Sequence, residues 1–113
     1  LDNFDDNFLE IIYLRNILYC QNFCESNHIE YYFTLGTARS KTKMQGSLEK
    51  YRDSIRKHIN WKNIFLVDGK YGFEEYALKT NAKKGSDNSH FGLEYNRLFG
   101  KLFLDWILEK KQV

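Results

Sequence analysis

Proline is absent from the sequence, and only two cysteines and one methionine occur among its 113 residues. Without proline, glycine and asparagine are the residues that most strongly interrupt helices and strands. The sequence also lacks a run of eighteen apolar residues, so no membrane-spanning helix is indicated. A signal-peptide pattern and a polybasic anchor are missing as well. We therefore expect an intracellular (cytoplasmic) protein with no membrane partner.

The two cysteines, Cys20 and Cys24, are four residues apart in a segment with a helical pattern. That spacing places both thiols on one helix face, where small buried hydrophobic residues are expected more readily than a disulfide. A zinc site would need further ligands at matched spacing, and the sequence offers none.

Apolar residues make up 42% of the chain and charged residues 28%, a balance that is typical of a domain with one hydrophobic core. Residues 1–113 are therefore predicted to form a single globular domain. The formal net charge is only +2. A basic surface for a partner has to be local, because the overall charge is too small to attract one.

The first predicted element is a long helix from Phe4 to Cys24, which contains neither glycine nor proline. Its apolar residues are not confined to one stripe. The helix is thus either central in the fold or in contact with another chain, and residues 4–24 are the expected surface for a homo-oligomer or a protein partner.

A strand is predicted at 28–35, where apolar and polar residues alternate. A loop at 36–46 follows, and Ser47 then begins a helix with apolar residues at three- and four-residue spacing. The short apolar run at 64–67 reads as a strand that is covered on both sides. Strand, helix and strand in this order predict a right-handed parallel crossover.

Asp68 and Gly69 form a turn signal, and the residues at 73–80 fit either a hairpin strand or a helix. After a polar loop, 91–111 has the clearest helical pattern. Gly100 within it costs about 1 kcal/mol relative to alanine, which is tolerable where a neighbouring backbone packs close. Together the elements predict an α+β fold with an α/β-like core, a long N-terminal helix, a parallel crossover, a possible hairpin and a long C-terminal helix.

Ligands of parallel sheets tend to bind beyond the carboxyl ends of the strands, where helix N-termini present unpaired N–H groups. Basic and hydroxyl side chains follow the first predicted strand and continue along the next helix. Such groups favour a phosphate. A lysine-rich solvated surface is the alternative. The predicted phosphate-binding residues are Arg39, Ser40, Lys41, Thr42, Lys43, Lys50, Arg52, Arg56 and Lys57.

Three stretches of the chain resemble the later part of type II restriction endonucleases of the PD-(D/E)xK class. They are 29–32 (IEYY), 37–40 (TARS) and 64–73 (IFLVDGKYGF). The resemblance implies that Glu30 is the metal-binding acid of the (D/E)xK pair. With Asp68 it forms the candidate catalytic and Mg²⁺-binding pair.

The chain departs from that family at Tyr32, which stands where the catalytic lysine is expected. No strand that bears the partnering aspartate precedes Glu30. Tyr32 lies on the polar face of its predicted strand, and we therefore expect it to stack on an unpaired base. The histidines, His28, His58 and His90, stand at element boundaries, where backbone hydrogen bonding is more common than catalysis.

These observations lead to a first hypothesis of a small nucleic-acid-binding or nuclease-related protein. The alternative is a protein-interaction module, such as an inhibitor, an immunity factor or an oligomeric accessory protein, that uses its apolar N-terminal helix. A third hypothesis is a metal-dependent phosphodiesterase that uses Glu30, Asp68 and either Glu74 or Glu75.

Overall fold

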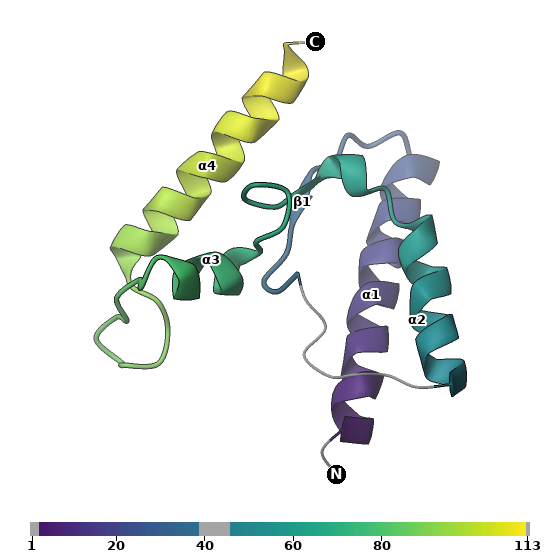
Figure 1. The fold of residues 1–113 in the computed structure, drawn as a ribbon. Helices are drawn as coiled ribbons and strands as arrows, with labels where there is room; N and C mark the ends of the chain where they lie inside the picture. The colour runs from purple at the N-terminus through teal and green to yellow at the C-terminus, as the bar shows by residue number, and fades with distance from the viewer. Residues whose placement is uncertain (1–2, 39–45, 113) are drawn as a thin grey trace. The chain divides into compact units, whose positions relative to one another are not determined.

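The computed structural model describes residues 3–38 and 46–112, and side chains from residue 7 onward within these ranges except that of residue 46. The described residues form helices and two short strands joined by loops, and the fold is therefore of the predicted mixed α+β class with long helices at both ends (Figure 1). The elements are α1 (Asn3–Ser26), β1 (Phe33–Thr34), α2 (Gly46–His58), the 3₁₀ turn η1 (Trp61–Asn63), β2 (Ile64–Phe65), α3 (Phe73–Lys79) and α4 (Leu93–Lys111). None of the described helices is long and apolar enough to cross a membrane.

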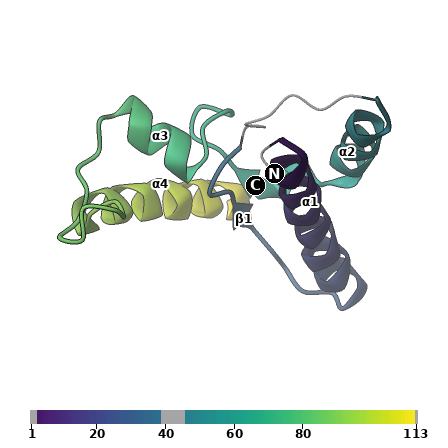
Figure 2. The same cartoon turned by 90° about the horizontal axis from the view of Figure 1, so that it is seen from below.

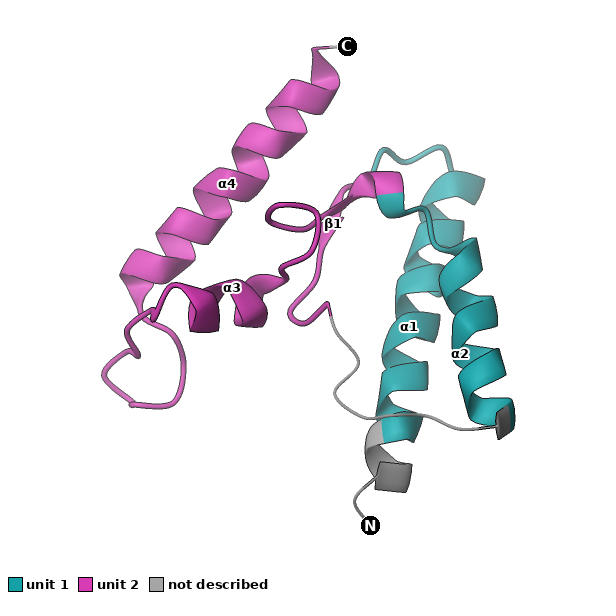
Figure 3. Cartoon of the chain, viewed as in Figure 1, with its two compact units in different colours: residues 1–31, 39–61 teal, residues 32–38, 62–113 magenta. Residues whose placement is uncertain are grey.

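The chain divides into two compact units (Figure 3). Unit 1 consists of Leu1–Tyr31 and Arg39–Trp61, and unit 2 consists of Tyr32–Ala38 and Lys62–Val113. Each unit therefore contains two separate stretches of the chain. The single domain expected for residues 1–113 stays a prediction, and the units are described one at a time.

Unit 1 is built on α1 and α2, which lie side by side in two views at right angles (Figures 1 and 2). Ile11 and Leu14 of α1 are buried, as are Ile55 in α2 and Ile59 just after it. The four-residue step from Ile55 to Ile59 keeps both side chains on one side of the helix, so they form the apolar face that the sequence predicts.

Polar side chains join the ends of these two helices. The buried Gln21 donates from Nε2 to the His58 carbonyl oxygen at 2.9 Å, and its Oε1 accepts from the Asn60 N–H at 2.6 Å. Asn60 Nδ2 donates to the Tyr31 hydroxyl at 3.3 Å, and that hydroxyl donates to the Glu25 carboxylate. The carbonyl at the end of α2 is thereby satisfied by a side chain from α1.

In unit 2, β1 and β2 are parallel, and the parallel strand–helix–strand crossover is confirmed. The Thr34 hydroxyl donates to the Phe65 carbonyl oxygen at 2.9 Å and ties the strands together. The predicted length of the first strand is wrong, since β1 spans only Phe33–Thr34 of the predicted 28–35. β2 offers only two paired residues, and a ladder cannot extend beyond its partner.

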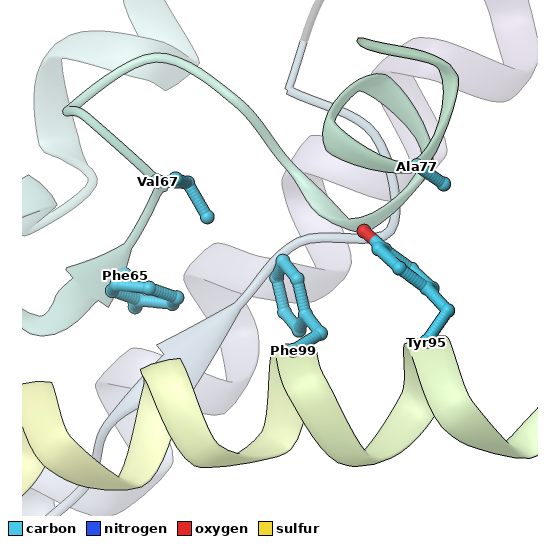
Figure 4. Packing of buried hydrophobic residues seen from close by; sticks show 5 residues of the cluster. All are labelled: Phe65, Val67, Ala77, Tyr95 and Phe99. Carbon is cyan, nitrogen blue, oxygen red and sulfur yellow. The ribbon is translucent and has the colours of Figure 1, made fainter. Parts of the chain in front are cut away.

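The core of unit 2 gathers side chains from β2, α3 and α4 (Figure 4). Phe65 belongs to this core, and its ring stacks on that of the partly buried Phe103 with centroids 5.6 Å apart. Residues 73–79 are helical, which decides between the two readings of this segment. The helix places Phe73 and the fully buried Ala77 on one face toward the core. The buried members of the core are Phe65, Val67, Ala77, Tyr95 and Phe99.

The predicted turn after β2 is confirmed. Asp68 and Gly69 have positive φ angles of 55° and 74°, and Val67 and Tyr71 form an antiparallel bridge across the turn. Glycine and aspartate tolerate this left-handed backbone better than most residues.

One smaller prediction is wrong in part. Both cysteines are free thiols, but Cys20 is exposed rather than buried and Cys24 is half-buried. Gly100 lacks the close backbone neighbour that would offset its cost, because a Cβ atom there would meet no described heavy atom within 4 Å.

Candidate nucleic-acid interface

The predicted phosphate-binding residues fall into two groups. Those at 39–43 lie outside the described residues. The remaining four, Lys50, Arg52, Arg56 and Lys57, belong to α2, and the structure gives them different surroundings.

Arg52 is held by carboxylates of unit 1. Its guanidinium lies 3.7 Å from Glu10 Oε2 of α1, 3.9 Å from Glu49 Oε1 and 3.2 Å from Asp53 Oδ1, and its side chain is only 16% exposed. Glu10 Oε2 is buried and has no hydrogen-bond partner among the described residues, so the charge of Arg52 compensates it at a distance. Arg52 thus neutralises carboxylates and is not presented to a ligand.

Arg56 stacks on the tryptophan that follows α2. Its guanidinium carbon lies 4.8 Å from the centroid of the Trp61 ring, and Trp61 Nε1 donates to the Arg56 carbonyl oxygen at 3.0 Å. This cation–π contact and hydrogen bond fix the half-buried Arg56 at the end of the helix.

Lys50 and Lys57 have a different environment. Both are exposed, and their seven-residue spacing places them on the same side of α2 together with the exposed Ser47 and Ser54. No described carboxylate forms an ion pair with either lysine. Arg52 holds the carboxylates of Glu49 and Asp53. We call Ser47, Lys50, Ser54 and Lys57 the α2 cationic face.

The carboxyl end of β1, where the sequence predicts a bound anion, is filled by a carboxylate of the protein itself. Glu75 of α3 accepts from the Thr37 hydroxyl at 2.6 Å, from the Ala38 N–H at 3.0 Å to each oxygen, and from the Gly72 N–H at 2.9 Å. The donors that a phosphate would use are therefore satisfied internally. Thr37 and Ala38 are thus occupied by Glu75, and the predicted phosphate contacts of 39–43 stay a prediction.

The sequence analysis names Glu75 only as an alternative metal ligand and misses its structural role. It stands three residues after Gly72, the N-cap of α3, in the position of the acid in a capping box. A capping box usually begins with serine or threonine, and glycine stands at this position instead. The three-residue spacing between Gly72 and Glu75 was the only feature of the sequence that could have indicated the motif.

The candidate metal residues lie in different units. Glu30 is exposed in unit 1, in the segment between α1 and β1, and Asp68 is exposed in the turn of unit 2. Across the described residues, no group of three or more His, Cys, Asp or Glu side chains could hold a metal ion. Glu75, an alternative ligand, uses both its oxygens in hydrogen bonds. The Mg²⁺ site and the resemblance to restriction endonucleases stay predictions.

Tyr32, the expected stacking platform, lies half-buried in unit 2. Its ring meets the Trp106 ring edge to face, with centroids 5.9 Å apart. Its proposed contact with a base stays a prediction.

Two histidines contact groups close to them in the chain. His58 Nδ1 lies 2.8 Å from the Ser54 carbonyl oxygen, which confirms a backbone contact at this boundary. His90 Nδ1 lies 2.6 Å from Asp87 Oδ2, and this contact, with the N–H groups of Ser89 and His90, holds the pKa of Asp87 well below its usual range. Neither arrangement includes a nucleophile.

No protein-family model matches the chain, and neither a curated protein nor a solved structure matches it significantly.

Proposed function

We propose that the protein binds nucleic acid through phosphate contacts made by the α2 cationic face. The observation that supports this most directly is the difference between the cations of α2. Arg52 forms ion pairs with the neighbouring carboxylates, whereas Lys50 and Lys57 are exposed on one side of the helix together with two serine hydroxyls. Lysine ammonium groups bind phosphates as point charges, and serine hydroxyls donate to phosphate oxygens.

Spacing favours contacts with two phosphates rather than one. Seven residues of α-helix rise by about 10 Å, so Lys50 and Lys57 are too far apart to share a single oxyanion. Each lysine that neutralises a phosphate releases counterions, which makes binding weaken as salt rises. In the sequence, Arg39, Lys41 and Lys43 precede α2 and would add to the same electrostatic contact.

The test is fluorescence anisotropy with labelled duplex and single-stranded oligonucleotides across a salt series. Lys50→Gln combined with Lys57→Gln should weaken binding to every base sequence about tenfold or more and lower the salt slope by about two. Lys62→Gln combined with Lys101→Gln is the control, because it removes the same charge from exposed positions in unit 2. Equal losses in both double variants, or binding that ignores salt, would contradict the proposal.

A third variant tests the predicted loop. Arg39→Glu combined with Lys41→Glu should weaken binding regardless of base sequence, because phosphate contacts carry no base information. A loss for one base sequence alone would contradict a phosphate-contacting role for these two residues.

A second candidate function is protein binding through α1. Four large side chains, spaced by four, seven and four residues, fall on one side of this helix and are exposed. The exposed fractions are 55% for Phe8, 36% for Ile12, 53% for Tyr19 and 63% for Phe23. Exposed apolar surface of this extent is typical of an interaction site.

Light scattering over a range of protein concentrations tests self-association through α1. Phe8→Ser combined with Phe23→Ser should abolish any oligomer, and Leu78→Ser, at an exposed leucine of unit 2, should not. A wild-type protein that is monomeric at every concentration would rule out the homo-oligomer.

A further inference from the structure

Tyr71 is held in place by the backbone of unit 2. Its N–H donates to the Val67 carbonyl oxygen at 2.9 Å, and its carbonyl oxygen accepts from the Val67 N–H at 2.8 Å. Its half-buried ring lies 6.3 Å from the Tyr76 ring, centroid to centroid. The position of the phenol is therefore set by the tight turn and by α3 packing beside it.

Two lysines from different elements converge on this phenol. Lys79, in the last turn of α3, donates from Nζ to the Tyr71 hydroxyl at 3.2 Å, and its Nζ lies 4.8 Å from the ring centroid. Lys70, in the turn, places its Nζ 5.1 Å from the same centroid. Neither lysine forms an ion pair with a described carboxylate.

This arrangement concentrates positive charge. Both ammonium groups contact one ring, so each lies within or near a Debye length of the other, about 8–10 Å at ordinary salt, and they repel each other. The effect reaches the phenol, because the hydrogen bond from Lys79, assisted by Lys70, lowers the pKa of Tyr71. An anion placed among the three groups would replace this repulsion with attraction.

We propose that Lys70, Tyr71 and Lys79, here called the Tyr71 cluster, bind a phosphate oxyanion. Two ammonium groups and one hydroxyl provide donors that several oxygens of a tetrahedral phosphate can accept at once. A phosphodiester of nucleic acid, a terminal phosphate monoester and free phosphate share this chemistry. The site goes beyond the α2 cationic face, since it uses other residues in the other unit, and either site can exist without the other.

Calorimetric titration of the full chain tests the Tyr71 cluster with three probes. They are inorganic phosphate, a short oligonucleotide with a 5′-phosphate and the same oligonucleotide without it. Lys70→Gln combined with Lys79→Gln should weaken binding about tenfold or more, because both charge-assisted contacts with the phosphate are lost. Tyr71→Phe keeps the ring and its cation–π contacts but removes the hydroxyl, so a smaller loss is expected.

A spectroscopic measurement supplies an independent readout. Phosphate bound at the cluster adds negative charge beside the phenol, so saturating phosphate should move the ultraviolet titration of Tyr71 to higher pH. This shift is identified by its absence in Tyr71→Phe. Circular dichroism confirms that the variants remain folded.

The control uses lysines that belong neither to the Tyr71 cluster nor to the α2 cationic face. Lys62→Gln combined with Lys101→Gln should bind all three probes as wild type does, because both residues are exposed elsewhere in unit 2. Tight binding of inorganic phosphate or of the 5′-phosphorylated probe alone would support the site with a terminal or free phosphate as ligand. Equal binding of both oligonucleotides would support it with a phosphodiester. Saturation by no probe, or equal affinities of wild type and the Lys70 and Lys79 double variant, would overturn the proposal.

Discussion

The two units use their aromatic residues in opposite ways. In unit 2 every aromatic side chain is buried or half-buried, and the Phe99 ring of α4 contacts both Phe65 of β2 and Phe73 of α3. In unit 1, the rings of Phe8, Tyr19, Phe23 and Tyr51 are exposed. Unit 2 therefore packs its aromatic rings against one another, whereas unit 1 leaves several of its rings exposed.

Polar contacts differ between the units as well. Unit 1 is joined by Gln21 and by the ion pair between Arg52 and Glu10, both of which bridge α1 and the α2 region. In unit 2, Glu75 binds backbone and side-chain donors at the N-terminus of α3, and the Thr34 hydroxyl joins the two strands. Polar side chains therefore join two helices in unit 1, and they join strands and a helix N-terminus in unit 2.

One tryptophan in each unit allows the comparison to be measured. Trp61 lies in unit 1 and Trp106 in unit 2, so Trp61→Phe leaves a reporter of unit 2 and Trp106→Phe a reporter of unit 1. Coincident denaturant transitions would support the predicted single domain, and separate transitions would indicate two.

The largest effect is expected from Phe99→Ala. Phe99 is 4% exposed and its ring lies 5.2 Å from that of Phe73 and 5.7 Å from that of Phe65. Its loss should reduce the free energy of unfolding of unit 2 by about 3–5 kcal/mol, because a cavity replaces the ring. Urea denaturation followed by Trp106 fluorescence measures this, with the exposed Leu104→Ala as control. A cost below about 1 kcal/mol would mean that the aromatic core does not stabilise unit 2 as described.

Unit 1 should respond most to a polar substitution. Gln21→Ala leaves the Asn60 N–H and the His58 carbonyl oxygen without their partner, and Gln21 is only 5% exposed. We expect a loss of about 1–3 kcal/mol, the penalty for buried polar groups left unsatisfied. Trp61 fluorescence reports the change, and Asn22→Ala on the exposed side of α1 is the matched control. A Gln21→Ala variant as stable as wild type would show that the Gln21 hydrogen bonds are not needed to hold α1 against α2.

The third prediction concerns alkaline pH. Burial raises the pKa of Tyr95 to about 12 from its ordinary value of 10.0, and its hydroxyl donates to the Phe73 carbonyl oxygen. A pKa raised on folding means that the neutral phenol stabilises unit 2 fully below about pH 10 and that this contribution is lost as pH rises toward 12. The difference in unfolding free energy between wild type and Tyr95→Phe should shrink by about 1 kcal/mol over that range. If the difference in unfolding free energy stayed constant between pH 10 and 12, the raised pKa of Tyr95 would be contradicted.

The existence and order of the elements could be predicted from the sequence. The pattern at 4–24 gives α1, which spans Asn3–Ser26, and the run of elements gives the parallel pairing of β1 with β2. Strand lengths could not be predicted, since a strand ends where its partner ends and that is not a local property. The conformation of segment 73–79 could not be predicted from local sequence either, because the helix is favoured by burial of Ala77 against the core.

The candidate site was harder to predict than the fold, because the contacts that hold its arginines involve residues outside α2. The sequence identifies Arg52 as a cation of α2 but does not reveal Glu10, which approaches Arg52 only when α1 packs on α2. Arg56 meets Trp61 beyond the end of the helix. Sequence therefore identified the four cations, and the packing separated the two that are engaged internally from Lys50 and Lys57.

The smallest expected effect is a gain in unit 2. Gly100 is exposed in the interior of α4, a Cβ atom there would meet nothing described within 4 Å, and its φ is not positive. Alanine can adopt the same backbone, so Gly100→Ala should stabilise unit 2 by about 0.5–1 kcal/mol, chiefly by restricting the unfolded chain. Gly72→Ala is the contrasting control, because its Cβ would lie 2.7 Å from Glu75 Oε1 and 2.9 Å from the Leu35 carbonyl oxygen, and it should destabilise the unit. Thermal unfolding followed by Trp106 separates the two variants. If Gly100→Ala were destabilising instead, some further surface would have to pack against α4 at this residue, and unit 2 would no longer be the self-contained member of the pair.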